Sequence, residues 1–366
     1  MTKRGLLLTV SLLQGTAAFS QPGSIITVGL EDFSDATEVR CLAVSGDFKW
    51  MVLASGQLES VAALNGTHSI AKTKAGYTLT TGADTFESTY FILKPDNNLG
   101  RVRLISATTG YRQYTGAVHF YWHTNQWHIA LETELEDYVA GVLVSEVGKG
   151  HAPELYTAHA AVSRTYALNT YGRHRLAGYD VCDQVHCQAF DGVSTVNDTI
   201  RQGCRATRHL VICDRLGRPI PAAFHSNCGG ITRSSQAVWQ KAYPHLVPVH
   251  DTSCTHGAHA KWEKAINASD WEDWLMRRSD EPINRVEPRE KFGLPSDRFD
   301  VRVDGEVVKL SGRGFGHGVG MCQEGAISRA QNGASPWAIL STYYQEIRLR
   351  SLQEITIPEA SGVWGK

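Results

Sequence analysis

The hydrophobic pattern of the sequence changes near residue 131, and this change limits the possible fold more than any other feature. Residues 24–130 alternate apolar and polar side chains over short runs, which Gly- and Asn-rich breaks separate. Such alternation puts one face of a strand into a core, so this part predicts antiparallel strands joined by turns. Residues 131–172 instead repeat apolar side chains at helical spacing. The predicted class is α+β, antiparallel and β-rich, with helices inserted after the first strands.

Two helices are expected directly after the change. The first begins at Leu135 and ends near Gly148. The second begins at Pro153, because proline suits the first helical position, and it continues to about Thr170. Short strands are expected within 200–250, and further helices at 269–272, at 324–331 with Gly333 as its stop, and from Ser335 through Tyr344.

The composition is that of an ordinary globular protein with nearly balanced charge. Of 366 residues, 42% are apolar and 20% are charged, and 36 basic against 37 acidic residues leave a net charge of -1. This balance gives no electrostatic reason to expect nucleic acid or an anionic membrane as a partner. Because no repeat or long linker interrupts the chain, we expect one domain over 24–350, with a β-rich part (24–130), a catalytic part (131–350) and a tail (351–366).

The first twenty residues have the pattern of a signal peptide. Lys3 and Arg4 precede an apolar run over 5–13, and small residues over 18–20 suit cleavage before Gln21. The run is too short to span a bilayer, and no later stretch reaches 18 apolar residues, so no membrane span is expected in the mature protein. The prediction is an exported protein, periplasmic or associated with the cell wall. A buried or disordered N-terminal segment is the alternative.

Eight cysteines leave both disulfides and metal binding open. An even number in an exported chain permits disulfides. Cys182, His186 and Cys187 can place three zinc ligands in one loop, and His174 could supply a fourth. A Cys182–Cys187 disulfide or two free thiols is the alternative for that loop. Elsewhere, a disulfide between Cys228 and Cys254 is expected to close the loop that carries His225, Ser226 and residues 238–239.

Glu146 differs from the other acids around it. The acids of 132–137 are typical of a solvated helix start, where they favour the helix dipole. Glu146 follows an apolar run at a helix-to-loop junction, and apolar surroundings raise the pKa of a carboxyl group. A raised pKa is what a general acid at neutral pH needs. An ordinary surface Glu at a helix end is the alternative.

Three further stretches carry polar side chains beside small residues. On the predicted helix 155–166, Arg164 and Tyr166 could point into a cleft, unless the Arg pairs locally. His225 and Ser226 precede two glycines, but no local acid completes a catalytic triad. Five glycines within 312–320 surround His317, which is a candidate ligand-binding residue. This loop is neither a Walker loop nor a dinucleotide fingerprint, and a glycine-rich bend in a strand is its alternative.

Taken in this order, the stretches resemble the SpoIID/LytB domain family. The resemblance rests on residues 135–146, 158–166, 186–188, 224–230 and 312–321, and it covers about 25–350. It implies a SpoIID-like fold with helices flanking a glycan cleft, Glu146 as catalytic acid, and possible structural zinc at His174, Cys182, His186 and Cys187, with no cofactor for catalysis. The substrate-binding residues that it implies are Arg164, Tyr166, Gln188, His225, Ser226, Arg313, His317 and Gln323.

The resemblance implies a lytic transglycosylase that acts on peptidoglycan glycan strands. Glu146 would protonate the glycosidic oxygen and then accept a proton from the C6 hydroxyl, giving a 1,6-anhydromuramyl product without a partner carboxylate. A non-catalytic wall-binding module, or an enhancer of a cell-wall amidase, is a second hypothesis, and a zinc hydrolase is a third. The sequence departs from the family at Val147 and at Cys228, Cys254 and Cys322, where many members have other residues.

Overall fold

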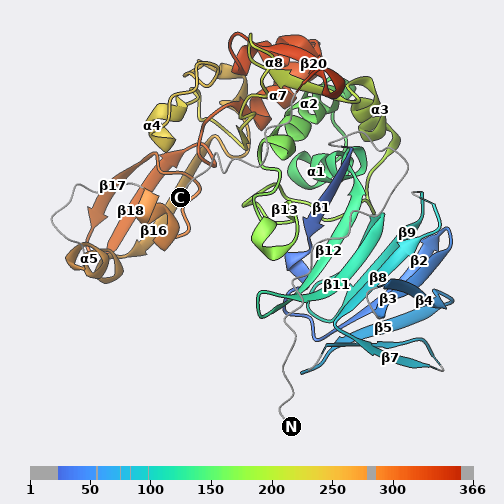
Figure 1. The fold of residues 1–366 in the computed structure, drawn as a ribbon. Helices are drawn as coiled ribbons and strands as arrows, with labels where there is room; N and C mark the ends of the chain where they lie inside the picture. Colours follow the sequence, from blue (N-terminus) through green and yellow to red (C-terminus); the bar gives the residue numbers. More distant parts are fainter. Residues whose placement is uncertain are drawn as a thin grey trace.

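The computed structural model describes residues 24–54, 57–74, 76–82, 84–97, 99–277 and 286–355. The predicted signal peptide (1–20) and the tail beyond residue 355 lie outside these ranges. Strands occupy the first hundred described residues, helices follow, and a small sheet comes late in the chain (Figure 1). The α+β class is therefore confirmed.

The N-terminal part consists of two sheets. The seven-stranded sheet is antiparallel except where β13 runs parallel to β1, and the six-stranded sheet is antiparallel throughout. In spatial order the first contains β13 (Val181–Cys182), β1 (Ile25–Gly29), β12 (Gln126–Glu134), β11 (Ala117–His123), β8 (Tyr90–Pro95), β3 (Phe48–Ala54) and β4 (Gln57–Ala63). The second contains β10 (Gly110–Thr115), β9 (Arg101–Ser106), β2 (Glu38–Ser45), β5 (Thr67–Lys72), β6 (Tyr77–Thr80) and β7 (Thr85–Ser88).

The two sheets share one hydrophobic core. The alternating pattern is visible in β9, where Val102 and Leu104 are fully buried and their neighbours are half-buried. Aromatic rings join the sheets, since Tyr77 of one packs edge-on against Phe120 and Trp127 of the other, with ring centroids 5.9 and 4.7 Å apart. Burying such rings supplies much of the packing energy of a domain. The alternation in the sequence therefore predicted this core correctly.

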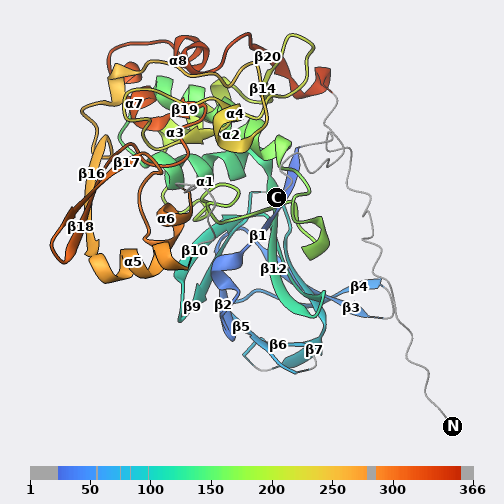
Figure 2. The same ribbon diagram turned by 90° about the vertical axis from the view of Figure 1, so that its left-hand side faces the viewer.

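The helices lie beyond one end of the sheets, as the second view shows (Figure 2). α1 (Leu135–Val147) continues directly from β12, and α2 (Pro153–Asn169) packs against α1 and against α3 (Asp198–Ala206). The other α-helices of this part are α4 (Ser235–Trp239), α7 (Gln323–Gln331) and α8 (Pro336–Tyr343). Two short strand pairs accompany them, β14 (Leu210–Cys213) with β20 (Arg348–Ser351) and β15 (Phe224–His225) with β19 (Met321–Cys322). The chain also forms four short 3-10 helices, η1 (Glu31–Phe33), η2 (Arg175–Ala177), η3 (Thr252–Cys254) and η4 (Leu352–Glu354), within the described ranges.

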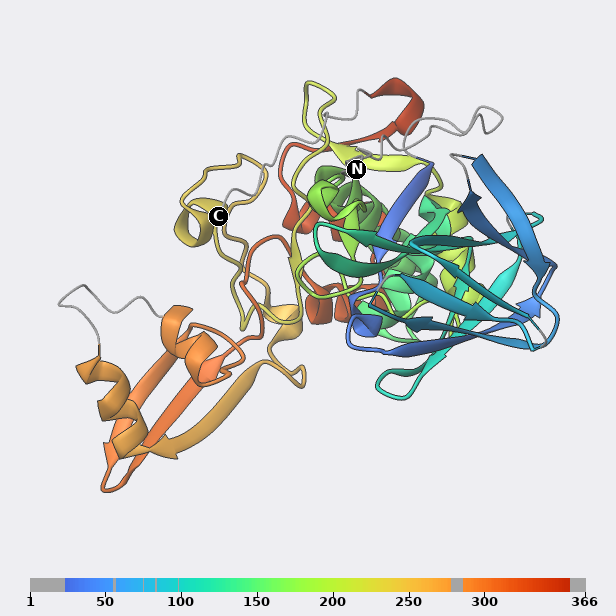
Figure 3. The same ribbon diagram turned by 60° about the horizontal axis from the view of Figure 1, so that its bottom comes forward.

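A third part extends away from the rest of the molecule (Figure 3). Its antiparallel sheet has the order β16 (Lys261–Asn267), β18 (Val307–Arg313), β17 (Phe299–Asp304), with α5 (Ala268–Met276) and α6 (Val286–Lys291) beside it. It has its own small core around Trp271 and Leu310. The predicted domain 24–350 thus contains three hydrophobic cores, one between the sheets and α1, one around α2, α7 and α8, and this small one.

The predicted helices agree closely with the structure, and the boundaries differ for identifiable reasons. α1 and α2 have the expected limits, and the Ser335 side chain caps α8 as expected by accepting a hydrogen bond from Ala338 N. The expected capping box at Ser269 is wrong, because α5 begins at Ala268 with Asn267 as its N-cap. Every helix in the described ranges is too short or too polar to cross a bilayer.

Candidate functional site

Glu146 lies in the last turn of α1, where the helix leaves the core. Seven residues of this helix between Leu135 and Leu143 are buried, whereas Glu146 is half-buried. The helix ends at Gly148, whose φ of 76° is a conformation that favours glycine. The apolar run thus anchors the helix and presents the Glu146 carboxyl at its end.

Two groups from distant segments hold the Glu146 carboxyl. The amide of Ala189 donates to Oε1 over 2.8 Å, and Gln323 Nε2 approaches Oε2 at 3.4 Å. Burial raises the pKa of Glu146, and these two hydrogen bonds lower it by less, so the net shift is upward. No neighbouring charge contributes to this shift. The expected raised pKa at Glu146 therefore has a physical cause in the structure.

A buried histidine continues the contacts of Gln323. Gln323 Nε2 lies 3.3 Å from His159 Nε2, and His159 Nδ1 lies 3.0 Å from Ser163 Oγ. Burial lowers the pKa of His159 to about 4, so the ring is neutral at pH 7. A neutral ring that accepts from Gln323 at Nε2 donates from Nδ1 to Ser163. This arrangement fixes the Gln323 amide with its nitrogen toward Glu146.

Gln188 and Tyr166 also lie at the site. Gln188 is buried, its Oε1 accepts from Tyr138 Oη at 3.4 Å, and its Nε2 has no hydrogen-bond partner. Tyr166 lies close enough to Glu146 for that carboxylate to raise the pKa of the phenol, although burial is the main cause. Tyr166 also hydrogen-bonds Arg173, whose Nη1 donates to His186 O over 2.6 Å. The structure therefore brings both predicted residues to Glu146.

His225 and His317 form a second group on the side of Gln323. β15 runs parallel to β19 with His225 opposite Cys322, the residue before Gln323. His225 Nδ1 donates to Val319 O over 3.0 Å, and its buried Nε2 has no partner. The His317 ring lies 5.6 Å from the His225 ring, and burial lowers the pKa values to about 4 and about 3, respectively. Both rings are neutral at pH 7.

No contact with Glu146 is found within the described ranges for three predicted substrate-binding residues, Arg164, Arg313 and Ser226. Arg164 is fully buried and forms a bidentate ion pair with Glu136, with nitrogen–oxygen distances of 2.9 and 2.6 Å. Its place is in the core between α1 and α2, where it pairs with a residue of the other helix and not with one close to it in sequence. Arg313 is exposed at the end of β18 in the third part. Ser226 is half-buried, and its carbonyl accepts from Glu324 N at 3.0 Å.

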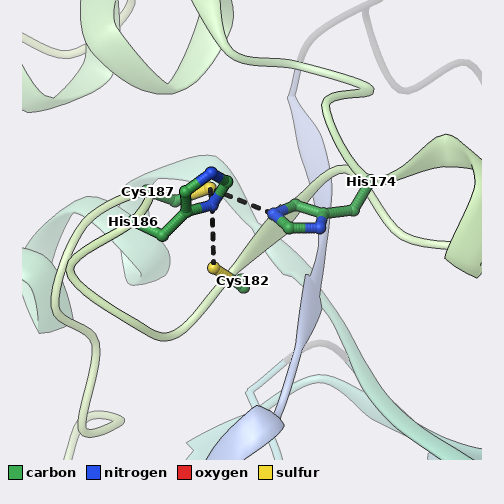
Figure 4. A group of neighbouring side chains, drawn as sticks. All are labelled: His174, Cys182, His186 and Cys187. Carbon is green, nitrogen blue, oxygen red and sulfur yellow. Dashed lines mark hydrogen bonds between the residues drawn. The ribbon is translucent and has the colours of Figure 1, made fainter. Parts of the chain in front are cut away.

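The four expected zinc ligands converge (Figure 4). One donor atom from each of His174, Cys182, His186 and Cys187 lies within 4.8 Å of all the others. Cys187 Sγ is 3.5 Å from His174 Nε2, and Cys182 Sγ is 3.8 Å from His186 Nδ1. A hydrogen bond from Cys182, and then Arg173, lowers the pKa of Cys187 to about 7. Two thiols and two imidazoles are a donor set that suits zinc.

All eight cysteines are free thiols, all of them within the described ranges. Cys182 and Cys187 are therefore not joined, and the alternative of a disulfide in that loop does not hold in this structure. Cys228 and Cys254 are neighbours as expected, but their sulfur atoms are 3.3 Å apart, beyond the length of a disulfide bond. The predicted Cys228–Cys254 disulfide is thus absent here.

Two surface pockets lie away from Glu146. One is lined by residues of β1, β8 and β12, and the other by residues around Leu216 and Arg350. Neither pocket contains a residue of the site just described. The polar side chains that converge on Glu146 are the better guide to function, because proton transfer and the binding of a polar substrate both need such groups. The expected glycan cleft stays a prediction.

Sequence reasoning missed three contributors to the site. The Ala189 amide could not be identified, because any residue can supply a backbone N–H. Arg173 gave no signal beyond its charge. His159 had one, since it is a lone polar ring in the run of small residues 158–161 that packs a helix closely.

Comparison with known proteins agrees with the resemblance that the sequence predicts. Residues 123–213 match the family model described as stage II sporulation protein, SpoIID. An uncharacterised protein of Brachyspira hyodysenteriae is 25% identical over 69% of this chain and 76% of its own length. Stage II sporulation protein D of Bacillus subtilis is 26% identical over 58% and 73%, and the amidase enhancer of the same organism is 22% identical over 58% and 40%. The matched segment contains Glu146 and all four expected zinc ligands, and the predicted resemblance to the SpoIID family is confirmed.

Proposed function

We propose that this protein cleaves peptidoglycan glycan strands as a lytic transglycosylase, with Glu146 as both acid and base. The observation that supports this most directly is the state of Glu146, a half-buried carboxyl whose pKa is raised by burial. Burial disfavours the charged form of this group and so favours the protonated form, which a general acid requires. Similarity to the sporulation and amidase-enhancer proteins supports a role at the cell wall.

The proposed reaction needs one carboxyl group. Glu146 donates its proton to the glycosidic oxygen, the bond from that oxygen to C1 breaks, and positive charge develops on the sugar ring. The Glu146 carboxylate then accepts the proton of the C6 hydroxyl while O6 bonds to C1, giving the 1,6-anhydro sugar without consuming water. Ordinary glycosidases use two carboxylates, whereas the hydroxyl of the sugar replaces water here. Oε1 accepts the shorter hydrogen bond, from Ala189 N at 2.8 Å, and Oε2 has only the 3.4 Å contact with Gln323 Nε2, so we assign the proton to Oε2.

Two unsatisfied groups support a polar ligand at this place. Gln188 Nε2 is a buried donor and His225 Nε2 is a buried acceptor, and neither has a hydrogen-bond partner among the residues that the structure describes. A buried polar atom without a partner costs about 1–3 kcal/mol, which a hydroxyl-rich ligand would recover. A glycan offers both donors and acceptors. We therefore assign Gln188 and His225, with Tyr166, to substrate binding.

We also propose that His174, Cys182, His186 and Cys187 hold a structural zinc ion. Four protein ligands fill a tetrahedral site, which is typical of structural rather than catalytic zinc, so no reaction step is assigned to the metal. Zinc would fix the loop that continues from Cys187 to Ala189, the donor to Glu146. The next turn of this loop is also tied to α1, because Asp191 N donates to Ser145 Oγ over 2.9 Å. Zinc would thus hold the acid in place.

The test uses glycan strands freed of stem peptides and intact sacculi, each incubated with wild type, Glu146→Gln and Glu87→Gln. Glu87 is exposed on β7, so it is a matched control for loss of one carboxylate. We expect 1,6-anhydromuramyl ends from wild type and Glu87→Gln, and none from Glu146→Gln, by mass spectrometry. Reducing ends, which are one water heavier, would contradict the transglycosylase and indicate hydrolysis.

A second candidate is an enhancer of a cell-wall amidase, which the similarity to the amidase enhancer favours. It predicts intact glycan with all three proteins, retained binding to sacculi, and faster release of stem peptides when a muramoyl-alanine amidase is added. Glu146→Gln would leave that acceleration unchanged. Cleavage by wild type that Glu146→Gln retains would overturn the role of Glu146 in either case.

A further inference from the structure

Four buried side chains converge at a second place, away from the expected zinc ligands. Cys228, Asp251, Cys254 and Cys322 are all fully buried, and one donor atom from each lies within 4.8 Å of all the others. They come from three segments, the loop after β15, the region of η3, and β19. This cluster shares no residue with the first and packs in the core around α2, α7 and α8.

The spacing of these atoms suits one small ion. Ligands about 2.3 Å from a zinc ion at tetrahedral angles lie about 3.8 Å from one another. The sulfurs of Cys228 and Cys254 are 3.3 Å apart, and Cys228 Sγ is 3.9 Å from Asp251 Oδ2. The observed distances bracket that value. Three sulfurs and one carboxylate oxygen are also a donor set that zinc accepts.

The surroundings orient these side chains as they would the ligands of a metal. Cys322 Sγ accepts from Cys228 N at 3.2 Å and from Gly325 N at 3.4 Å, and thiolates are stabilised by such N–H donors. Tyr343 Oη donates to Asp251 Oδ2 over 2.7 Å, and Arg329 pairs with Asp251 Oδ1 at 3.1 Å. Carboxylate ligands are in general held by such outer hydrogen bonds.

We propose that Cys228, Asp251, Cys254 and Cys322 bind a structural zinc ion. A disulfide would use two of these sulfurs and leave the third beside a buried carboxylate, whereas one divalent ion uses all four donors. The ion would join the loop after β15, the region of η3 and strand β19. It would also fix Cys322, the N-cap of α7 and the residue before Gln323, which contacts Glu146.

Metal content tests this proposal on the full-length chain. Wild type, Cys254→Ser, Cys187→Ser and a Cys182→Ser/Cys187→Ser/Cys254→Ser variant are purified with zinc, desalted and measured by plasma mass spectrometry. We expect two zinc ions per wild-type chain, one after either single substitution and none in the triple variant. If the first cluster does not bind, the wild type holds one and Cys254→Ser holds none. Cys41→Ser, a buried cysteine of β2 outside both clusters, is the matched control and keeps the wild-type count.

A second measurement keeps the proposal testable if Cys254→Ser does not fold. A Cys182→Ser/Cys187→Ser variant retains the new cluster intact and is loaded with cobalt. Charge-transfer absorption per cobalt should be about 1.5 times that of a cobalt site with two thiolate ligands, because three thiolates bind instead of two. Absence of this absorption, or a Cys228–Cys254 linked peptide in a non-reducing digest of freshly purified wild type, would overturn the proposal.

Discussion

The buried ion pair between Arg164 and Glu136 is the interaction whose loss we expect to cost most. Arg164 has no solvent exposure and Glu136 has 17%. The guanidinium also donates to Leu210 O at 2.9 Å. Glu136→Gln removes the negative charge and keeps the shape of the side chain. It thereby leaves an arginine that stays charged in the core.

The magnitude follows from that burial. Removing one partner of a buried pair costs about 3–5 kcal/mol, because the remaining charge is left uncompensated. Arg164→Met should fall at the lower end, about 3 kcal/mol, since the Glu136 carboxylate reaches solvent and accepts from His209 N. The double variant with Glu136→Leu removes both charges. It should lose only about 1–3 kcal/mol for the orphaned Leu210 carbonyl, far less than the sum of the single variants.

Urea unfolding followed by fluorescence and circular dichroism measures these free energies, and the two probes check for two-state behaviour. Glycan cleavage per folded molecule is measured on the same samples below the unfolding transition. We expect lower stability with unchanged cleavage in Glu136→Gln. A loss below about 1 kcal/mol together with abolished cleavage would refute the reasoning and return Arg164 to the substrate site.

Two further predictions concern the surroundings of the acid. Gln323→Leu removes a hydrogen bond that lowers the pKa of Glu146, so that pKa should rise further. Because the protonated acid is the active form, the alkaline limb of the pH–rate profile should move to higher pH. A shift of this limb to lower pH would contradict the prediction. Gly141→Ala would place Cβ 2.4 Å from the ring of Phe190, so we expect about 1–3 kcal/mol of lost stability by urea unfolding, with Phe190→Leu restoring part of it, and an unchanged midpoint would contradict this.

Side-chain patterns in the sequence predicted the helices and strands that are determined by residues close together in the chain. Alternation along residues 24–130 reflects a two-sheet core, and Pro153 and Ser335 start helices through their own backbone and side-chain chemistry. The third part was not predicted. In β17 all residues but Phe299 are exposed, so the hydrophobic signal that identifies a strand is weak there.

The site was predictable only where the residue type carries the chemistry. The proposed zinc ligands are four side chains of the right type within fourteen residues, so the sequence alone was enough to predict that they form one group. The position of Arg164 was not predictable in this way, because a charged residue in a helix of small residues can face either a cleft or a buried partner. Its partner, Glu136, lies 28 residues away in the sequence. Contacts at that separation depend on how helices pack, which no local pattern encodes.

The position of the Glu146 carboxyl depends on three segments far apart in the chain. Its own helix continues from a strand of the large sheet, and its two oxygens are contacted by residues 43 and 177 positions further on. The first contact follows β13, which pairs with β1 of the same sheet and ends in the first cysteine cluster. The second follows β19, which pairs with β15 and ends in the other cysteine cluster. In this arrangement a ligand of each proposed zinc ion lies one or two residues before a group whose hydrogen bond lowers the pKa of the acid. Loss of metal from either cluster should therefore change the pH dependence of catalysis before it unfolds the chain. A small displacement of Ala189 or Gln323 is enough to break its hydrogen bond to Glu146, whereas the hydrophobic core tolerates a displacement of that size.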